Sequence, residues 1–373
     1  MALNFAIAGG GTGGHVTPAL ALAEAISQRG DQALFIGSDQ GVETRWVPEA
    51  GFDLVALPSR QVLGRGWLGR LLGVLAILGA VRGARRALRE FGADGVISVG
   101  GYAAMPASIA AILCRTPLFL VTVDAIPGRV ARLSMRFSRI VFSGFESTES
   151  TESTESATAE KRVRCLGVPL RRALIDQFRD APLRRKPEAP FRVLVFGGSR
   201  GARQINEAMM AALPQLKNLS IQIVHQTGAA DRERVASAYA DHDIHATVLD
   251  FEPDMPSRYR WADLAICRAG ALTVAELALS GLPALLIPYP FAAGDHQSAN
   301  ARELELAGAA QVLQSLGLAG ERAELLHQAL ARLLATPETL VAMSAAALKR
   351  ARPDAAQRIV DECAEELRGG SRS

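Results

Sequence analysis

The sequence predicts an α/β protein with two Rossmann-like, doubly wound domains. At 373 residues the chain is long for a single hydrophobic core. Short apolar runs alternate with helical patterns, which is typical of parallel strands covered by helices on both faces. The same alternation starts again in the second half of the chain. Two such sheets in tandem would face a central cleft at the carboxyl ends of their strands, where folds of this class bind ligands.

The expected elements of the first half begin with a buried strand at the N-terminus. Its strands are Phe5–Ala8, Ala33–Ile36, Gly95–Val99 and Leu118–Val123, with helices at Pro18–Gln28 and Pro106–Leu113. In the second half the strands are Arg192–Phe196, Ser220–His225, Ala246–Leu249, Leu264–Cys267 and Ala284–Ile287. The helices between them are Ala202–Leu213, Arg232–Tyr239 and Leu272–Ser280.

Two breaks in the pattern mark the domain boundary. Glu146–Ser156 is a Glu-Ser-Thr repeat without apolar side chains, which predicts a solvated loop, and Asp180–Pro190 is rich in proline and basic residues. We place the hinge near Val163–Leu170, the first domain at residues 1–164 and the second at residues 165–349. The last helix, about 350–369, is a candidate to pack back on the first domain.

Composition narrows the class of ligand. The formal net charge of +3 is too small to indicate nucleic-acid binding but suits an anionic ligand or membrane surface, and aromatic residues make up only 5%. The four cysteines form no C-x-x-C pair, which favours reduced thiols in a cytoplasmic protein over disulfides or a zinc site. The N-terminal apolar run has no basic segment before it and is interpreted as a strand, not a signal peptide.

The segment Leu63–Leu88 has two interpretations. It is apolar at first and then strongly basic, with Arg82, Arg85 and Arg86 in its second half. Glycines and arginines interrupt it too often for a membrane span. It is either a helix that packs on the core with a solvated basic end, or a surface segment that rests on anionic lipid.

Two glycine-rich loops follow predicted strands and precede helices, a setting in which backbone N–H groups face an anion. The first is Gly9–Gly14 with His15 at its end, a candidate general base. No lysine follows, so it is not a P-loop. The second is Gly197–Gly201, where small residues let the backbone approach a diphosphate and Ser199 adds a hydroxyl.

Polar residues downstream of the second loop suit the rest of a nucleotide sugar. Glu276, near the start of a helix, is placed to accept from ribose hydroxyls, although a glutamate there also complements the helix dipole. Asp295-His296-Gln297 with Asn300 suits a sugar or a plain helix cap.

Taken in order, the motifs resemble the MurG family of peptidoglycan glycosyltransferases over almost the whole chain. They are GGGTGGH-x-x-P, GGY, A-I-P-G, G-V-P-L-R, GGS-x-GA-x-x-IN, H-Q-T-G, C-R-A-G-A-x-T-x-AE and D-H-Q-x-x-N-A. The resemblance implies a GT-B fold and inverting transfer of N-acetylglucosamine (GlcNAc) from UDP-GlcNAc to the 4-hydroxyl of undecaprenyl-linked lipid I, giving lipid II. It implies no cofactor and no metal, and a peripheral location on the cytoplasmic side of the cell membrane.

By position, the resemblance also assigns site residues. It places donor binding on Thr12, Gly13, Gly14, Arg171, Gly198, Ser199, Gly201, Phe251, Glu252, Arg268, Ala271, Leu272, Thr273, Glu276, His296 and Gln297. It makes His15 the candidate base and places Gly11, Gly101, Tyr102 and Asp124 on the acceptor side. Contact with the anionic inner-membrane surface falls on Trp67, Leu68, Leu71 and Leu72.

The chain departs from the family pattern only in the first half. Val121-Thr122-Val123-Asp124 stands where the family has H-E-Q-N, and Ala104 and Met105 replace a serine and a glycine. Because these positions belong to the acceptor side, two alternatives stay open: a UDP-GlcNAc-dependent transferase with another lipid or small-molecule acceptor, and a non-catalytic nucleotide-sugar-binding protein.

Overall fold

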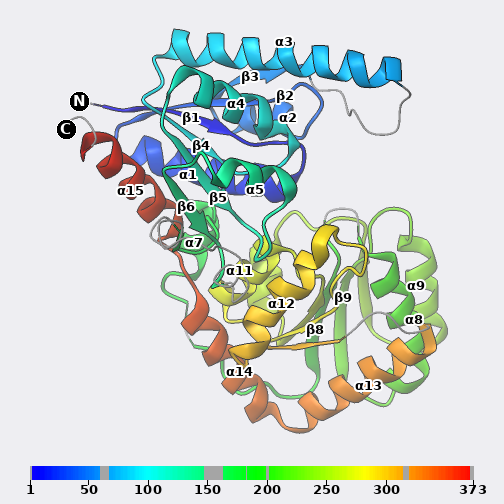
Figure 1. Ribbon diagram of the computed structural model, residues 1–373. Helices are drawn as coiled ribbons and strands as arrows, with labels where there is room; N and C mark the ends of the chain where they lie inside the picture. Colours follow the sequence, from blue (N-terminus) through cyan, green and yellow to red (C-terminus); the bar gives the residue numbers. More distant parts are fainter. Residues whose placement is uncertain are drawn as a thin grey trace. The chain divides into compact units, whose positions relative to one another are not determined.

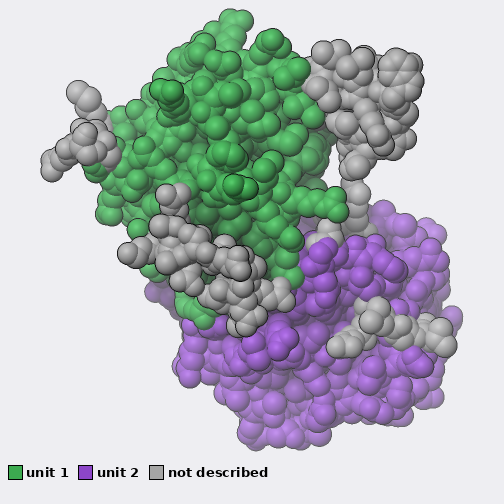
Figure 2. Space-filling view, in the orientation of Figure 1, with its two compact units in different colours: residues 1–172, 352–373 green, residues 173–351 purple. Residues whose placement is uncertain are grey.

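The computed structural model describes residues 2–58, 67–146, 163–181, 183–198, 201–313 and 319–369. The chain divides into two compact units, residues 1–172 with 352–373, and residues 173–351 (Figures 1 and 2). Each unit contains one parallel sheet with helices on both of its faces.

The described strands of the first unit form a seven-stranded parallel sheet in the order β3-β2-β1-β4-β5-β6-β7. The strands are β1 (Asn4–Ala8), β2 (Gln32–Ser38), β3 (Asp53–Leu57), β4 (Gly95–Ser98), β5 (Leu118–Thr122), β6 (Ile140–Ser143) and β7 (Val163–Cys165). Phe5, Ala6, Ile7 and Ala8 are fully buried. The central strand is therefore covered on both faces, which explains its continuous apolar run.

The helices of the first unit connect these strands. They are α1 (Gly13–Gln28), α2 (Glu43–Glu49), α3 (Trp67–Phe91), α4 (Met105–Cys114) and α5 (Arg129–Met135), and α7 (Arg172–Phe178) begins at the end of the unit. Alternate strand residues, among them Ala6, Ala8 and Val96, pack with α3 and α4 in one core cluster. In its second half α3 buries Ala84 and Leu88 and exposes Arg82, as expected for a helix packed on the core with a solvated basic side.

The C-terminal helix α15 (Ala355–Gly369) belongs to the first unit and packs against α1 (Figure 1). Its apolar side, including Ile359 and Val360, is buried. Arg29 forms an ion pair with Asp361, and Arg164 forms one with Glu362 at 2.5 Å.

The unit boundary differs from the one expected from the sequence. Val163–Cys165, part of the predicted hinge, is strand β7 and pairs with β6. The following chain is buried, and a side chain at Gly167 would overlap Arg352 where the C-terminal segment returns. Since strand pairing and burial hold these residues in the sheet, the first unit continues to residue 172 instead of ending at 164.

The described strands of the second unit form a six-stranded parallel sheet in the order β10-β9-β8-β11-β12-β13. They are β8 (Phe191–Phe196), β9 (Ile221–Gln226), β10 (Ala246–Leu249), β11 (Leu264–Cys267), β12 (Ala284–Leu286) and β13 (Ala310–Val312). The helices are α8 (Arg203–Leu216), α9 (Arg232–Asp241), α10 (Met255–Trp261), α11 (Ala271–Ser280), α12 (His296–Leu306), α13 (Ala319–Ala335) and α14 (Pro337–Arg350). One core cluster joins α8 and α13 to alternate strand residues such as Val193, Val195 and Ile266.

Candidate functional site

In the second unit, the strand order reverses between β8 and β11, which are direct neighbours. The connection after β8 leads to α8, and the connection after β11 leads to α11. Because the two helices leave toward opposite faces of a doubly wound sheet, this is the point at which such sheets open a crevice for a ligand. The loop after β8 is the second glycine loop, and α11 carries Thr273 and Glu276.

The second glycine loop is shaped by positive backbone angles. Gly198 has φ +91° and Gly201 has φ +72°, and the Gly201 N–H donates to the Gly198 carbonyl at 2.8 Å. A side chain at Gly201 would overlap the Thr227 carbonyl. Both positions therefore require glycine. Ser199 and Arg200 lie outside the described residues.

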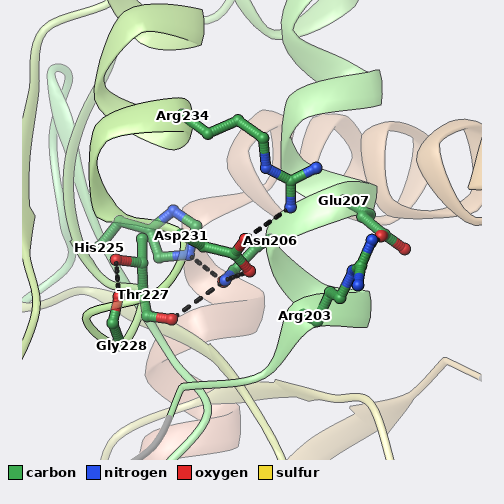
Figure 3. A network of polar contacts seen from close by, with 8 residues as sticks. All are labelled: Arg203, Asn206, Glu207, His225, Thr227, Gly228, Asp231 and Arg234. Carbon is green, nitrogen blue, oxygen red and sulfur yellow. Dashed lines mark hydrogen bonds and ion pairs between the residues drawn. The ribbon is translucent and has the colours of Figure 1, made fainter.

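A buried network fixes the chain beneath this loop (Figure 3). The amide of Asn206, on α8, donates to the Thr227 carbonyl at 3.0 Å and to Asp231 at 2.8 Å. Its oxygen accepts from Nε2 of His225 at 3.1 Å, while Nδ1 of His225 accepts from the Tyr239 hydroxyl at 3.0 Å. Burial lowers the pKa of His225 to about 3, so the ring is neutral. The I-N and H-Q-T-G motifs thus hold each other, and Gln226 adds a 3.0 Å bond to the Gly198 carbonyl.

Helix α11 brings its N-terminus and the carboxylate of Glu276 to the same edge of the sheet. Gly270 is its N-cap, and Ala271, Leu272 and Thr273 form the first turn. Glu276 lies in the second turn and accepts from the Tyr259 hydroxyl at 2.7 Å. Removal from water raises the pKa of Glu276 to about 7.

The loop after β10 carries one exposed aromatic side chain and one buried acidic side chain. Phe251 is 55% exposed, whereas Glu252 is buried. Glu252 accepts from the backbone N–H of Asp254 at 2.9 Å and pairs with Arg258. Its carboxylate is used inside the loop, which leaves backbone atoms and the Phe251 ring to face outward.

Arg268 points into the protein. Its guanidinium donates to the carbonyls of Ile287 and Pro288, both at 2.9 Å, and to Gln204 at 2.7 Å, and it lies 5.3 Å from the centre of the Tyr289 ring. Burial lowers its pKa to about 10. These contacts tie the loop after β11 to α8 and to the end of β12.

The polar cluster near residue 296 begins helix α12. Gln297 accepts from the Tyr289 backbone N–H at 2.9 Å, and the buried Asn300 donates to the Ala269 carbonyl at 3.1 Å. His296 stands at the first position of the helix and is partly exposed. Asn300 therefore fixes the loop that precedes α11, while His296 and Gln297 lie at the helix start.

The first unit repeats this plan at its own switch point, between β1 and β4. Gly11 has φ +86°, and a side chain there would come within 2.7 Å of the Tyr102 ring. A side chain at Gly101 would lie 3.4 Å from Nδ1 of His15. The Thr12 hydroxyl lies 3.1 Å from that same ring nitrogen. The structure thus brings His15, Thr12, Gly11, Gly101 and Tyr102 together.

Two other predicted residues of the first unit lie on other segments of the chain. Nε of Arg171 lies 2.5 Å from Oε1 of Glu24 on α1, and the Arg172 N–H donates to the other oxygen of Glu24 at 3.0 Å. Asp124 follows β5 and is partly exposed. Trp67, Leu68, Leu71 and Leu72 belong to α3, but their side chains lie outside the described residues.

Comparisons with known proteins agree with this architecture. The model of the glycosyltransferase family 28 N-terminal domain matches residues 5–143, and that of the C-terminal domain matches residues 192–359. A UDP-N-acetylglucosamine--N-acetylmuramyl-(pentapeptide) pyrophosphoryl-undecaprenol N-acetylglucosamine transferase of Pelobacter propionicus is 40% identical over 96% of this chain and 98% of its own. The enzyme of the same name from Myxococcus xanthus is 40% identical over 96% of this chain and 92% of its own. The crystal structure of Acinetobacter baumannii MurG superposes with a TM-score of 0.78 at 31% identity, covering 96% of this chain and 98% of that one.

The chain belongs to the MurG family. The predicted GT-B fold and the predicted class of enzyme, a glycosyltransferase, are confirmed by these matches. A UDP-GlcNAc 2-epimerase from Neisseria meningitidis, solved with UDP-GlcNAc bound, shares the fold at a TM-score of 0.68 but only 13% identity. At that identity the likeness extends to the fold alone.

The structure adds contacts to the candidate site residues that the sequence motifs did not indicate. Tyr259 holds Glu276, and Glu43 accepts from the Gly11 N–H at 2.8 Å. Neither lies in a glycine-rich motif, and each meets its partner only through the tertiary fold. In the described part of the chain no group of three or more His, Cys, Asp or Glu side chains is placed to hold a metal. No described helix is both long and apolar enough to cross a bilayer.

Proposed function

We propose that this protein transfers GlcNAc from UDP-GlcNAc to lipid I and releases lipid II and UDP. The observation that carries the proposal is the switch point of the second unit in a chain of the MurG family. There the glycine loop with positive φ at Gly198 and Gly201 and the helix that carries Glu276 follow two adjacent strands, β8 and β11. Backbone N–H groups and a helix N-terminus stabilise a diphosphate both when it is bound and when it leaves as UDP.

The donor is proposed to bind along this edge. The diphosphate contacts the backbone of Gly197–Gly201, with Ser199, and the first turn of α11 at Ala271–Thr273. Glu276 accepts from the ribose hydroxyls, and Phe251 with the backbone of Glu252 reads the uracil. His296 and Gln297 bind hydroxyls of the GlcNAc ring. Arg268 acts through the loops it ties together. Arg171 is proposed to approach the diphosphate only when it leaves Glu24.

The acceptor is proposed to bind at the glycine loops of the first unit. His15 removes the proton from the attacking 4-hydroxyl, and its contact with Thr12 orients the ring for this step. Attack on the face opposite the UDP inverts the anomeric carbon. Gly11, Gly101, Tyr102 and Asp124 line the acceptor side, and Thr12, Gly13 and Gly14, at the start of α1, are proposed to contact the donor.

A peripheral location on the cytoplasmic membrane surface is proposed from exposed apolar side chains beside arginines. Around α5, Leu133 is 60% exposed and Phe137 is 53% exposed. The residues that directly precede Leu133 and Phe137 in the sequence, Arg132 and Arg136, are exposed as well. This four-residue spacing places an apolar stripe next to a basic stripe, the arrangement of an interfacial helix on anionic lipid.

Helix α4 extends the same feature. Ile112 and Leu113, at its end, are 37% and 55% exposed, and Arg115 follows them. Together with Trp67, Leu68, Leu71 and Leu72 of α3, these residues are the proposed membrane contact.

The test is transfer of labelled GlcNAc from UDP-GlcNAc to a panel of acceptors: a lipid I analogue, other polyprenyl phosphosugars and small hydroxylated molecules. Labelled product on lipid I alone supports the proposal. Product only on another acceptor would support a transferase of different specificity, and UDP-GlcNAc binding without turnover on any acceptor would support a binding protein.

A further inference from the structure

A buried carboxylate stands behind the first glycine loop. Glu43, the first residue of α2, is 0% exposed. Its Oε2 accepts from the Gly11 N–H at 2.8 Å, and its Oε1 accepts from the Ser38 N–H at 2.9 Å. Across the described ranges, neither oxygen pairs with a lysine or arginine. Hydrogen bonds from two backbone N–H groups therefore replace the hydrogen bonds to water that this carboxylate loses on burial.

Three glycines around Glu43 leave room for it. A side chain at Gly10 or Gly41 would overlap the carboxylate, and one at Gly37 would come within 3.0 Å of its Cγ. Gly10 follows β1, Gly37 lies in β2 and Gly41 precedes α2. Gly10 of the first loop thus has a reason to be glycine that involves no ligand, because it makes room for a side chain of the protein itself.

This carboxylate occupies the position at which a glycine loop would receive a phosphate. Backbone N–H groups after the first strand of a doubly wound fold are a common anion site, and here the Gly11 N–H already binds an anion. A phosphate at the same group would meet like charge at short distance in a poorly solvated place, which is unfavourable.

Glu43 also acts on the groups that face outward. Gly11, held at φ +86°, precedes Thr12, which contacts His15 at 3.1 Å. The Tyr102 ring packs against Gly11. A shift of Gly11 would therefore move both His15 and Tyr102.

We propose that Glu43 is a positioning residue, which binds the first glycine loop from inside and thereby presents His15 and Tyr102 to the acceptor. The inference rests on the proposed function, in which that loop serves the acceptor. It further assigns the Gly11 amide to the protein, so that this amide contributes nothing to binding the donor diphosphate.

The kinetic test compares E43Q with E49Q. Gln at position 43 keeps the size of the side chain but offers one acceptor and turns an NH₂ group toward the second N–H. Glu49 lies on the same helix, is exposed and pairs with Arg45 at the surface, so E49Q controls for loss of charge on α2. We expect E43Q to lower kcat/KM for the acceptor by about tenfold or more through loss of alignment, with UDP binding unchanged and E49Q unaffected. Equal activity of E43Q and E49Q would overturn the proposal.

A second experiment separates positioning from loss of folding. E43A leaves a small space lined by the N–H groups of Gly11 and Ser38, into which formate fits. Formate, and not chloride, is expected to restore several-fold of the lost kcat/KM in E43A. A variant that stays inactive in formate while binding UDP normally would refute the proposal.

A third readout requires no transfer activity. Amide hydrogen exchange at Gly11 and Ser38 should accelerate in E43Q relative to E49Q, with the amides of β8 and β9 unchanged. If the wild-type protein transfers GlcNAc to no acceptor, the proposed function is wrong. The exchange rates still show in that case whether Glu43 holds the loop. Unchanged exchange at Gly11 would show that it does not.

Discussion

Replacing Glu276 by glutamine should stabilise the second unit at pH 8 and have little effect at pH 4. Removal from water raises the pKa of Glu276 from 4.5 to about 7. Below pH 4.5 the carboxyl is protonated in both the folded and unfolded states. As the pH rises toward 7, the unfolded chain releases this proton while the folded chain keeps it, so the free energy of unfolding falls.

The size of this effect follows from the two pKa values. A tenfold difference in proton affinity corresponds to about 1.4 kcal/mol. Raising the pKa of Glu276 from 4.5 to about 7 therefore costs the folded state at most about 3 kcal/mol above pH 7. Glutamine resembles the protonated acid, and its amide oxygen still accepts from the Tyr259 hydroxyl. The difference in stability between E276Q and the wild type should thus grow by about 2 kcal/mol or more between pH 5 and pH 8.

The assay is urea unfolding of the full chain in a background where Trp46 and Trp67 are replaced by phenylalanine. The remaining Trp261 lies on α10, two residues from Tyr259, and reports on the second unit. E276A is the matched control, since it leaves the Tyr259 hydroxyl without its acceptor and should cost about 1–3 kcal/mol already at pH 5. A stability difference between E276Q and wild type that does not change with pH would refute the reasoning.

Three further predictions concern other parts of the molecule. If ribose hydroxyls donate to ionised Glu276, UDP-GlcNAc should bind up to about tenfold more weakly at pH 6 than at pH 8, as measured by calorimetry. The E276Q variant should bind UDP-GlcNAc weakly at both pH values. A wild-type affinity that does not depend on pH would contradict the role of Glu276. Asn206→Ala should lower the free energy of unfolding of the second unit by about 1–3 kcal/mol, because it removes the hydrogen bonds that Asn206 makes to Nε2 of buried His225 and to the Thr227 carbonyl. Asn218→Ala, at an exposed position just after α8, should change it little in the same urea titration. Leu133→Ser with Phe137→Ser should reduce sedimentation with anionic liposomes but not neutral ones, compared with Leu183→Ser in the second unit, and equal loss in both variants would argue against the α5 contact.

Much of the fold was predictable because it depends on local patterns. Strands buried on both faces, such as β1 and β8, are continuous apolar runs, and the predicted bounds of β10 and β11 agree with the structure. Four strands were not predicted: β3 is only partly buried, β7 and β13 have three residues each, and β6 is a short buried strand of four residues. Their pairing depends on the neighbouring strand more than on their own sequence.

The unusual backbone of the candidate site was predictable where it depends on glycine. Gly198 and Gly201 have positive φ angles, which glycine adopts readily. What the sequence did not indicate are contacts made across crossover connections. Glu43 meets Gly11 from 32 residues away, and Tyr259 meets Glu276 from another helix. Arg268 was assigned to donor binding, but its guanidinium points into the protein, where it donates to backbone carbonyls and to Gln204.

Coupled transfer of GlcNAc from UDP-GlcNAc to lipid I is tested by following both products in one reaction. Purified protein is incubated with doubly labelled UDP-GlcNAc and a lipid I analogue in anionic vesicles, and UDP and labelled lipid are quantified at each time. We predict one UDP per labelled disaccharide lipid, with the new GlcNAc in β configuration. Release of UDP with free sugar and no labelled lipid would show that the protein hydrolyses UDP-GlcNAc and does not transfer GlcNAc to lipid I.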